Sequence, residues 1–483
     1  MSDNPFINEP YAPAPESTKV AIKDEYGLFI DNTFAPAEDG LTRETVNPAN
    51  GNLVARVAEA GPADVDRAVL AARKAYDKNW SRMAPAERGK YLFRLARLIQ
   101  ERSRELAVLE SMDGGKPIRE SRDVDIPLVA AHFFYYAGWA DKLDYAFPNR
   151  NWRPHGVAGQ IIPWNFPLLM AAWKLAPALA CGNTVVLKPA EFTPLTALYL
   201  AELIQEAEFP PGVINILTGG SAAGRAIVEH EGTNKIAFTG STEVGKLIQR
   251  SLAGTGKPYT LELGGKAAHI IFEDAAIDQA VEGIVNGIFF NQGHVCCAGS
   301  RLLVQEGIVD ELMRKLEYRI KTLIVGDPLD KNTDIGAINN QPQCDKIHEF
   351  LKEAEEQGLE LVDGGQELPE TGLWCRPTIV KNAPQSCRIV REEVFGPVLA
   401  VQTFRNPDEA IEKANNTRYG LSGGVWTDKG SKIFKITNEI QAGVLWANTF
   451  NKFDPTAPFG GYKESGMGRE GGMHGLSPYV KLD

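Results

Sequence analysis

The run GVAGQIIP at 156–163, followed by FPLLMAAWKLAPALAC at 166–181 and TVVLKP at 184–189, decides the fold of this chain. The first and third runs are short and apolar, which predicts two buried strands. The middle run is long enough for a helix, and Gly182 directly after it is a typical helix stop. A strand, a helix and a second strand in this order indicate a parallel crossover, so we expect a doubly wound α/β sheet.

The same alternation extends on both sides of this segment. The expected elements are helices at 63–80, 85–113 and 193–207, strands at 213–218 and 235–239, and helices from about Ala222 and Thr242. The second half, from about Glu262 to Trp446, alternates less regularly and has no fixed-period repeat, which disfavours a solenoid. The segment 144–154, with two prolines, two asparagines and an exposed-looking Trp152, interrupts the pattern as a connector or edge element.

Composition limits the classes of function. The chain has 483 residues and is 43% hydrophobic, enough for about three domain-sized units. A net charge of −11 and a pI near 5.4 argue against nucleic acid or an anionic membrane as the main partner. No apolar run is long enough to span a bilayer, and residues 1–20 look like a flexible arm rather than a signal peptide. These features favour a cytoplasmic protein.

Cysteine and histidine usage favours free thiols and gives no metal-binding motif. Six cysteines in so long a chain do not form a disulfide framework, so we expect free thiols. Cys344 and His348 share a helical face, but two ligands do not make a zinc site. We therefore expect no metal.

Two segments could bind a nucleotide. In KIAFTGSTEVG at 235–245 a strand enters a Gly-x-x-x-x-Gly turn, where backbone N–H groups and a helix dipole attract phosphate. The spacing is not the usual dinucleotide fingerprint, and glycines needed only for a tight turn would look the same. Lys188 and Glu191 follow another strand, where a carboxylate could accept ribose hydroxyls and repel a 2′-phosphate. A solvated charge pair is the simpler alternative.

Three further residues could carry covalent chemistry. Cys296, beside Cys297 among small residues, could be a nucleophile if it is held partly as thiolate, although a lone cysteine is usually inert. Glu262, between two leucines, would gain a raised pKa on burial and become a general base; otherwise it pairs with Lys266. Asn165, at a strand-to-helix turn, could donate to an oxyanion, or it could simply cap a helix.

Taken together, these segments resemble the aldehyde dehydrogenase superfamily over nearly the whole chain, from about residue 27 to 480. The matching runs are PWNFP at 163–167, KPAE at 188–191, FTGSTEVG at 238–245, LELGGK at 261–266, NQGHVC at 291–296, EEVFGP at 392–397 and PFGGYKESG at 458–466. Each run is moderately specific, and seven of them in the family's order make chance agreement negligible.

The resemblance implies a fold and a division into domains. It implies a Rossmann-like, doubly wound NAD-binding domain at 21–135 and 155–261 and an α/β catalytic domain at 262–469. A short oligomerisation excursion, formed by 136–154 and 470–483, completes the expected architecture. Both parts of this excursion look shorter than is usual in relatives, so we expect a homodimer rather than a tetramer.

The resemblance also assigns roles residue by residue. The catalytic set comprises Cys296 as the nucleophile, Glu262 as the general base, Asn165 as the oxyanion donor assisted by the Cys296 N–H, and Lys174 and Glu470 as a proton exit path. The cofactor-binding set comprises Ile161, Trp164, Lys188, Glu191, Gly219, Gly240, Ser241, Gly245, Leu263, Glu393 and Phe395. The substrate tunnel comprises Phe166, Met170, Trp173, Val295, Phe453 and Phe459.

These roles imply oxidation of an aldehyde to a carboxylic acid through a Cys296 thioester, which water activated by Glu262 then hydrolyses. Glu191 favours NAD, while NADP stays open because some relatives with this glutamate use it. The aromatic and aliphatic tunnel without an obvious Arg clamp favours apolar or aromatic aldehydes. Two alternatives are an enzyme that transfers the acyl group to coenzyme A, which Glu262 disfavours, and a non-catalytic protein with the same fold.

Overall fold

The computed structural model describes residues 12–483. Of the expected flexible arm at 1–20, residues 1–11 lie outside this range. The next residues contact the body of the protein: the Ala14 N–H donates to Asp330 Oδ1 (3.1 Å) and the Glu16 N–H donates to Leu329 O (2.8 Å). Among the described residues, no helix is long and apolar enough to cross a membrane.

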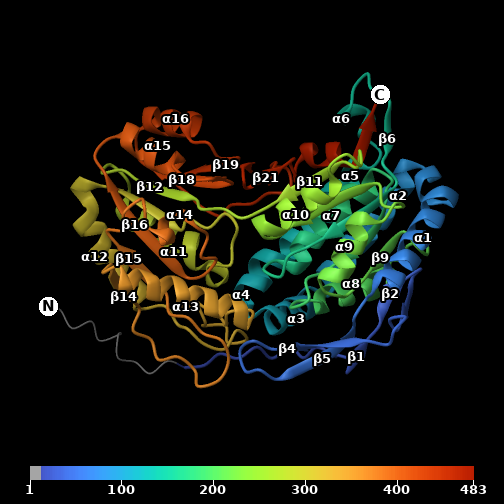
Figure 1. The fold of residues 1–483 in the computed structure, drawn as a ribbon, viewed down its shortest axis with the longest axis horizontal. Coiled ribbons are helices and arrows are strands. Elements are labelled where there is room, and N and C mark those ends of the chain that lie inside the picture. The colour runs from blue at the N-terminus through green and yellow to red at the C-terminus, as the bar shows by residue number, and fades with distance from the viewer. Residues whose placement is uncertain (1–11) are drawn as a thin grey trace.

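An eight-stranded sheet forms one half of the molecule, at the right in Figure 1. Its strand order is β21 (Gly466–Met467), β11 (Tyr259–Glu262), β10 (Lys235–Thr239), β7 (Val157–Ile161), β8 (Thr184–Lys188), β9 (Ile214–Ile216), β2 (Leu28–Ile30) and β3 (Thr33–Ala35). The five strands from β11 to β9 are parallel, and β21, β2 and β3 are antiparallel additions. The strands predicted at 156–163, 184–189, 213–218 and 235–239 are confirmed.

Helices cover both faces of this sheet because alternate strand residues point to opposite sides. Val185 and Leu187 of β8 join one hydrophobic core, and Val186 joins another. The first core contains α2 (Pro85–Glu101), α5 (Ile126–Trp139), α7 (Pro167–Ala180) and α8 (Leu195–Glu206). The second contains α1 (Pro62–Lys78), α9 (Ser221–Glu229) and α10 (Thr242–Leu252). The prediction of a doubly wound α/β sheet is therefore confirmed.

The single helix predicted at 85–113 is wrong in one respect. The structure has α2, which ends at Glu101, and then α3 (Ser103–Gly114), with Arg102 between them outside the helical region (φ −99°, ψ 15°). Periodicity alone does not detect one non-helical residue between two helices. The predicted stop is confirmed, since α3 ends at Gly114 and Gly115 follows in the left-handed conformation.

A seven-stranded sheet forms the other half, at the left in Figure 1. Its order is β14 (Glu360–Asp363), β15 (Thr378–Lys381), β16 (Val398–Phe404), β13 (Arg301–Gln305), β12 (Ala268–Ile271), β18 (Ser422–Trp426) and β19 (Val444–Ala447). All its strands except β14 are parallel. Its helices are α11 (Ile277–Phe289), α12 (Val309–Ile320), α13 (Gln341–Glu356), α15 (Pro407–Asn415) and α16 (Gly430–Glu439).

Three small sheets complete the fold, and one of them pairs β17 (Tyr419–Gly420) antiparallel with β20 (Tyr462–Lys463). β1 (Glu25–Tyr26), β5 (Leu53–Ala58) and β4 (Thr42–Val46) form a ribbon along the lower edge in Figure 1. The segment predicted as a connector contains α6 (Leu143–Ala146) and the edge strand β6 (Trp152–Pro154), which pairs antiparallel with β22 (Val480–Leu482). Trp152 is half-buried rather than exposed, because its indole Nε1 donates to Asp144 Oδ1 (2.7 Å).

Candidate active site

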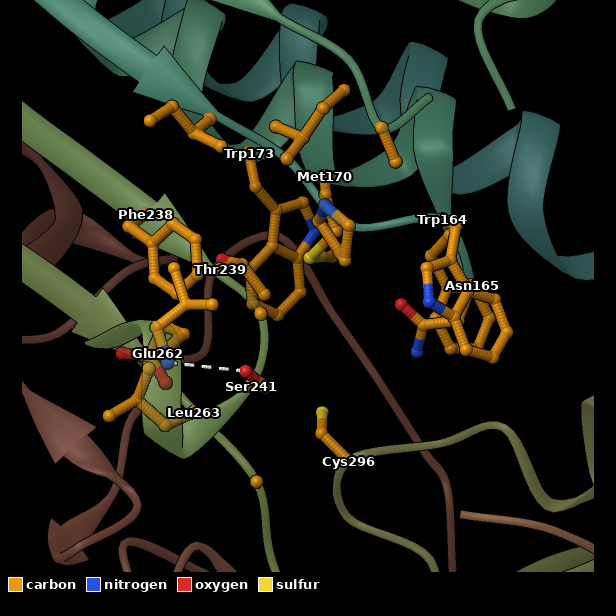
Figure 2. A pocket seen from close by; sticks show the side chains of 18 of the residues that line it. Trp164, Asn165, Met170, Trp173, Phe238, Thr239, Ser241, Glu262, Leu263 and Cys296 are labelled. Atoms are coloured by element: carbon orange, nitrogen blue, oxygen red, sulfur yellow. Dashed lines mark hydrogen bonds between the residues drawn. The ribbon is translucent and has the colours of Figure 1, made fainter. Parts of the chain in front are cut away.

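A cavity of about 670 Å³ lies between the two halves of the molecule. Ile161, Lys188, Thr239 and Glu262, the last residues of four parallel strands, line it on one side. Figure 2 shows the side chains of Asn165, Glu262 and Cys296 around this pocket. The structure places all the predicted site residues on the cavity wall except Lys174, Gly219 and Gly245.

Glu262 is a buried carboxyl group without a hydrogen-bonding partner. Its side chain ends β11 and lines the cavity, the residue is only 4% exposed, and neither carboxyl oxygen is paired. Gly460 packs against it, since a Cβ there would lie 2.9 Å from Glu262 Oε1. Burial, followed by the charge of Glu470, raises the pKa of Glu262 well above its usual value. The alternative pairing with Lys266 is not formed.

Cys296 lies on an irregular loop between α11 and β13. It is half-buried and lines the cavity, and its carbonyl oxygen packs against Gly265, where any side chain would overlap it. The neighbouring Cys297 thiol, followed by burial, raises the pKa of Cys296 well above that of an ordinary thiol. Both the adjacent thiol and burial therefore act against the thiolate form that a nucleophilic role requires.

Asn165 follows β7 and is 7% exposed. It does not cap α7, whose N-cap residue is Phe166, so the helix-capping alternative does not hold. Its Nδ2 donates to His294 O (2.7 Å), which uses one of the two amide hydrogens, and its backbone oxygen accepts from Asn291 Nδ2 (2.8 Å). The amide is thus tied to the loop that carries Cys296.

Lys174 and Glu470 form a buried ion pair, of which only Glu470 reaches the cavity. Lys174 Nζ lies 2.5 Å from Glu470 Oε1, and the two side chains are 0% and 3% exposed. Glu470 lines the cavity, and its Oε2 has no partner. Glu470 and Lys174 act in opposite directions on Glu262, because the first raises the pKa of that carboxyl and the second lowers it.

Lys188 and Glu191 lie at the carboxyl end of β8, on the same wall. Lys188 is only 4% exposed, and its Nζ donates to Pro189 O (2.9 Å) and Gly219 O (2.6 Å). Burial lowers the pKa of Lys188. Its Nζ lies 3.9 Å from Glu191 Oε2. A buried lysine held by two carbonyl groups is not the solvated charge pair that the sequence allowed. Gly219 contributes its carbonyl to Lys188 rather than lining the cavity.

The turn after β10 combines a helix N-terminus with close glycine packing. Ser241 caps α10 by accepting the Val244 N–H at its Oγ (3.3 Å), the interaction drawn in Figure 2. Gly245 lies behind the cavity wall, where a Cβ would come within 2.5 Å of Leu263. Gly245 is therefore a packing glycine. Thr239 Oγ1 is buried at the cavity edge without a partner.

Glu393 and Phe395 reach the cavity from the other half of the molecule. Glu393 Oε1 accepts the Gly265 N–H (2.8 Å), and burial raises the pKa of Glu393 to about 7. Phe395 has a positive φ of 59°. Its ring meets Trp164 edge-on at 5.3 Å between centroids. These contacts fix Glu393 beside the turn that follows Glu262, and Phe395 beside the turn that follows β7.

Comparison with known proteins now decides the family. The model of the aldehyde dehydrogenase family matches residues 34–483. The chain belongs to this family. It is 48% identical to Retinal dehydrogenase 2 of Homo sapiens over 468 residues, which cover 94% of this chain and 90% of the relative. It resembles the solved NAD⁺ complex of the aldehyde dehydrogenase from Bacillus cereus with a TM-score of 0.93 and 40% identity, over 96% and 99% of the two chains.

A third relative is the indole-3-acetaldehyde dehydrogenase of P. syringae, solved in complex with NAD⁺ and IAA. The TM-score is 0.92 and the identity 40%, and the match covers 96% of each chain. The predicted aldehyde dehydrogenase fold is therefore confirmed, with the two parallel sheets and the cavity between them.

The residues that the resemblance assigned to a substrate tunnel form a mainly aromatic part of the cavity wall. Ring centroids lie 5.3 Å apart for Trp173 and Phe459 and 5.9 Å apart for Phe453 and Phe459. Phe290 stacks on Phe166 at 6.2 Å. All these side chains line the cavity.

Several residues that line the cavity were not predicted from the sequence. Gln343 and Lys346 of α13, Asp125 of the π-helical turn Ser121–Asp125, and Lys452 all line the cavity. Each is a polar residue in or near a helix or loop, where polar residues normally face solvent, so no local pattern identifies it. Elsewhere, Cys344 Sγ lies 3.8 Å from His348 Nδ1. No group of three or more potential metal ligands occurs within residues 12–483.

Proposed function

We propose that this protein oxidises aldehydes to carboxylic acids with NAD as the electron acceptor, through a thioester on Cys296. The observation that carries the proposal is that the Cys296 sulfur, the Asn165 amide and the unpaired Glu262 carboxyl all line one cavity. These are the three kinds of group that an acyl-enzyme mechanism needs: a nucleophile, an oxyanion donor and a base.

The cofactor side of the cavity fits NAD on structural grounds. Thr239 Oγ1 is an unpaired polar atom at a turn whose following helix presents its N-terminus, a favourable environment for a diphosphate. Glu191, half-buried beside Lys188, would accept ribose hydroxyls. Glu393 is held by Gly265 where it would receive the second ribose. The carboxylate of Glu191 would repel the 2′-phosphate of NADP, so we rank NAD first and keep NADP as a weaker cofactor.

In the first half of the reaction, Cys296 Sγ loses its proton to solvent water and bonds to the aldehyde carbon. The carbonyl oxygen becomes an oxyanion that accepts hydrogen bonds from Asn165 Nδ2 and the Cys296 N–H. One such donor contributes roughly 2.7–4 kcal/mol of transition-state stabilisation. A bound nicotinamide supplies the two-electron oxidation that converts this adduct into the thioester.

In the second half, the ionised Glu262 takes a proton from water while the water oxygen adds to the thioester carbon. The carbon–sulfur bond then breaks, which releases the carboxylic acid and leaves Cys296 as the thiolate, while Glu262 keeps the proton taken from water. The raised pKa of Glu262 makes its carboxylate a stronger base than an exposed glutamate. Glu470 and Lys174, as a buried pair beside it, would receive the proton that Glu262 must give up before the next cycle.

The decisive experiment is an assay of NADH formation with a panel of aldehydes, with and without coenzyme A, run beside Cys296→Ala. We expect activity without coenzyme A and none with the variant. Dependence on coenzyme A would instead identify an acyl-transferring enzyme, and absence of activity with every aldehyde would favour a non-catalytic protein. Unchanged turnover by Cys296→Ala would overturn the mechanism.

The substrate class that we propose is an apolar or aromatic aldehyde, because the tunnel wall is largely aromatic. The test compares kcat/KM for an apolar aldehyde with that for succinic semialdehyde. A strong preference for the second, which carries a carboxylate, would refute this assignment and point to Lys452 at the cavity wall.

The assembly that we propose is a homodimer. The β6–β22 ribbon contains only three paired residues per strand, a small edge on which to build a second interface. Light scattering should return twice the mass of one chain. A stable tetramer would refute the proposal.

A further inference from the structure

The loop that carries Cys296 begins with an unusual backbone. Asn291 (φ 48°, ψ 43°) and Gln292 (φ 53°, ψ 25°) are both left-handed, and Gly293 follows with φ 75°. Residues other than glycine rarely adopt this conformation, and it persists only where the surroundings fix it. Something outside the loop must therefore hold Asn291 and Gln292.

Two sets of contacts hold them. Gln292 is bound by main-chain groups, since its Nε2 donates to Ala337 O (3.0 Å) and its Oε1 accepts the Gly336 N–H (3.3 Å). Asn291 is held by a side chain: its N–H donates to Glu120 Oε2 at 2.8 Å, across 171 positions of sequence. Glu120 is thus the side chain that fixes the first left-handed residue of the loop.

Asn291 is also hydrogen-bonded to Asn165 and to His294 of the Cys296 loop. Its Nδ2 donates to Asn165 O (2.8 Å) and lies 3.4 Å from His294 O, and Asn165 Nδ2 donates to the same His294 O (2.7 Å). A closed set of hydrogen bonds therefore joins Glu120, Asn291, Asn165 and His294, two residues before Cys296. A shift of Asn291 would move the oxyanion donor relative to the nucleophile.

Glu120 lies near a buried charged cluster, whose Lys116 and Asp125 act on it electrostatically. Lys116 Nζ contacts Asp125 and lies 3.3 Å from Glu110 Oε1, and it sits 4.2 Å from the centroid of the Phe166 ring. Glu120 and the three ionisable residues of this cluster are all buried. Burial raises the pKa of Glu120 to about 8. At neutral pH Glu120 is therefore mainly a neutral acid, and glutamine is close to it in shape and charge.

We propose that Glu120 is a positioning residue for the nucleophile, which sets the separation of Cys296 and Asn165 through Asn291. The inference rests on the proposed function, in that Cys296 and Asn165 are taken as the reacting pair. It predicts that Glu120 affects kcat more than KM, because an oxyanion donor acts mainly in the transition state.

The test compares Glu120→Gln, which keeps the acceptor, with Glu120→Leu, which removes it. The readouts are kcat, KM and the rate at which iodoacetamide alkylates Cys296 in the absence of cofactor, followed by peptide mass spectrometry. For Glu120→Leu we expect kcat to fall about 100-fold, the typical cost of a displacement near 1 Å, with an altered alkylation rate and little change in KM. Glu120→Gln should keep both rates within about threefold of the original.

A matched control separates positioning from general stability. Asp113 is also a buried carboxyl group that accepts a distant backbone N–H, that of Leu195 (2.8 Å), but Leu195 lies on α8, whereas Asn291 lies on the Cys296 loop. Asp113→Leu should lower the melting temperature and leave kcat and the alkylation rate nearly unchanged. Equal losses of kcat in Asp113→Leu and Glu120→Leu would overturn the inference, as would a normal kcat in Glu120→Leu.

Asn291→Gly provides an independent route if Glu120→Leu does not fold. Glycine tolerates the left-handed backbone and keeps the N–H that binds Glu120, but it removes the bridge to Asn165. We expect the same fall in kcat, and a normal kcat would contradict the inference. Cys296→Ala in parallel distinguishes the two failures: turnover by that variant refutes the mechanism, whereas an inactive Cys296→Ala with a normal Glu120→Leu refutes only the positioning role.

Discussion

The two walls of the cavity place their functional groups in different ways. On one wall, Lys188 and Glu262 are the last residues of parallel strands and Asn165 follows another, and sheet register aligns them: Ile161 pairs with Lys188 and with Phe238, and Thr239 pairs with Glu262. On the other wall, Cys296 lies on irregular backbone fixed by contacts from distant segments. Regular structure positions the base, whereas the nucleophile and the amide that is hydrogen-bonded to its loop depend on tertiary support.

The largest expected effect concerns chemistry on the regular wall. Glu262→Gln keeps the shape but removes the base, so steady-state turnover should fall by about 10²–10⁴-fold, while a rapid burst of NADH, equal to the enzyme present, remains. Because the pKa of Glu262 is raised, its carboxylate forms only as pH increases. Turnover of the unmodified enzyme should therefore rise with pH, and this rise should be absent from the pH profile of Glu262→Gln.

Rapid-quench kinetics across the pH range test this prediction. Glu409→Gln, on α15 and outside the cavity lining, serves as a control that should leave the burst and the steady state unchanged. A steady-state rate in Glu262→Gln equal to the original would show that another group activates water.

A smaller effect is expected from the amide on the same wall. Asn165→Ala removes one oxyanion donor, so kcat/KM should fall by about 10²–10³-fold, or roughly 2.7–4 kcal/mol. The measurement is kcat/KM with one good substrate, together with the melting temperature. If kcat/KM changed less than about threefold in a folded protein, the backbone N–H of Cys296 would be the main donor.

The third prediction probes the irregular wall with a glycine pair. Gly293 and Gly254 both have positive φ values, 75° and 78°, but a Cβ at Gly293 would overlap Gly396 O, whereas one at Gly254 meets nothing within 4 Å. Gly254→Ala should cost about 1–2 kcal/mol of unfolding free energy from backbone strain alone. Gly293→Ala should cost about 2–5 kcal/mol, since overpacking adds to the strain, and should impair activity. Urea unfolding of both variants measures the difference, and equal losses would contradict the tight support inferred for this loop.

The smallest effect concerns the ionisation of the nucleophile. The Cys297 thiol is the first cause of the raised pKa of Cys296, so Cys297→Ala should lower that pKa. The pH at half-maximal alkylation of Cys296 should therefore move down, and the alkylation rate near pH 8 should increase. Cys344→Ala, outside the cavity lining, is the control. An unchanged pH profile in Cys297→Ala would assign the shift to burial alone.

The contrast between the two cavity walls also explains which features could be predicted from the sequence. The strands and helices around Lys188 and Thr239 were predictable because buried apolar runs alternate locally along the chain, and the residues that end them were natural candidates for a site. The left-handed Asn291 and its partner Glu120 were not predictable, because their hydrogen bond joins positions far apart in the sequence. Glu393 and Phe395 came from family resemblance alone, since no local pattern marks them. The raised pKa of Cys296 was not predictable either, because it depends on how the folded chain buries this thiol beside that of Cys297.

The order of strands in the eight-stranded sheet has a consequence for synthesis on the ribosome. The sheet starts with β2 near residue 28 and is completed by β21 at Gly466–Met467, which covers the open edge of β11. The strand that ends in Glu262 is made about 200 residues before β21, which at about 5–20 residues per second corresponds to roughly 10–40 s. During that time the outer edge of this strand has no partner in the sheet. A nascent chain of this protein therefore exposes this edge to aggregation, or to chaperones, until β21 is made.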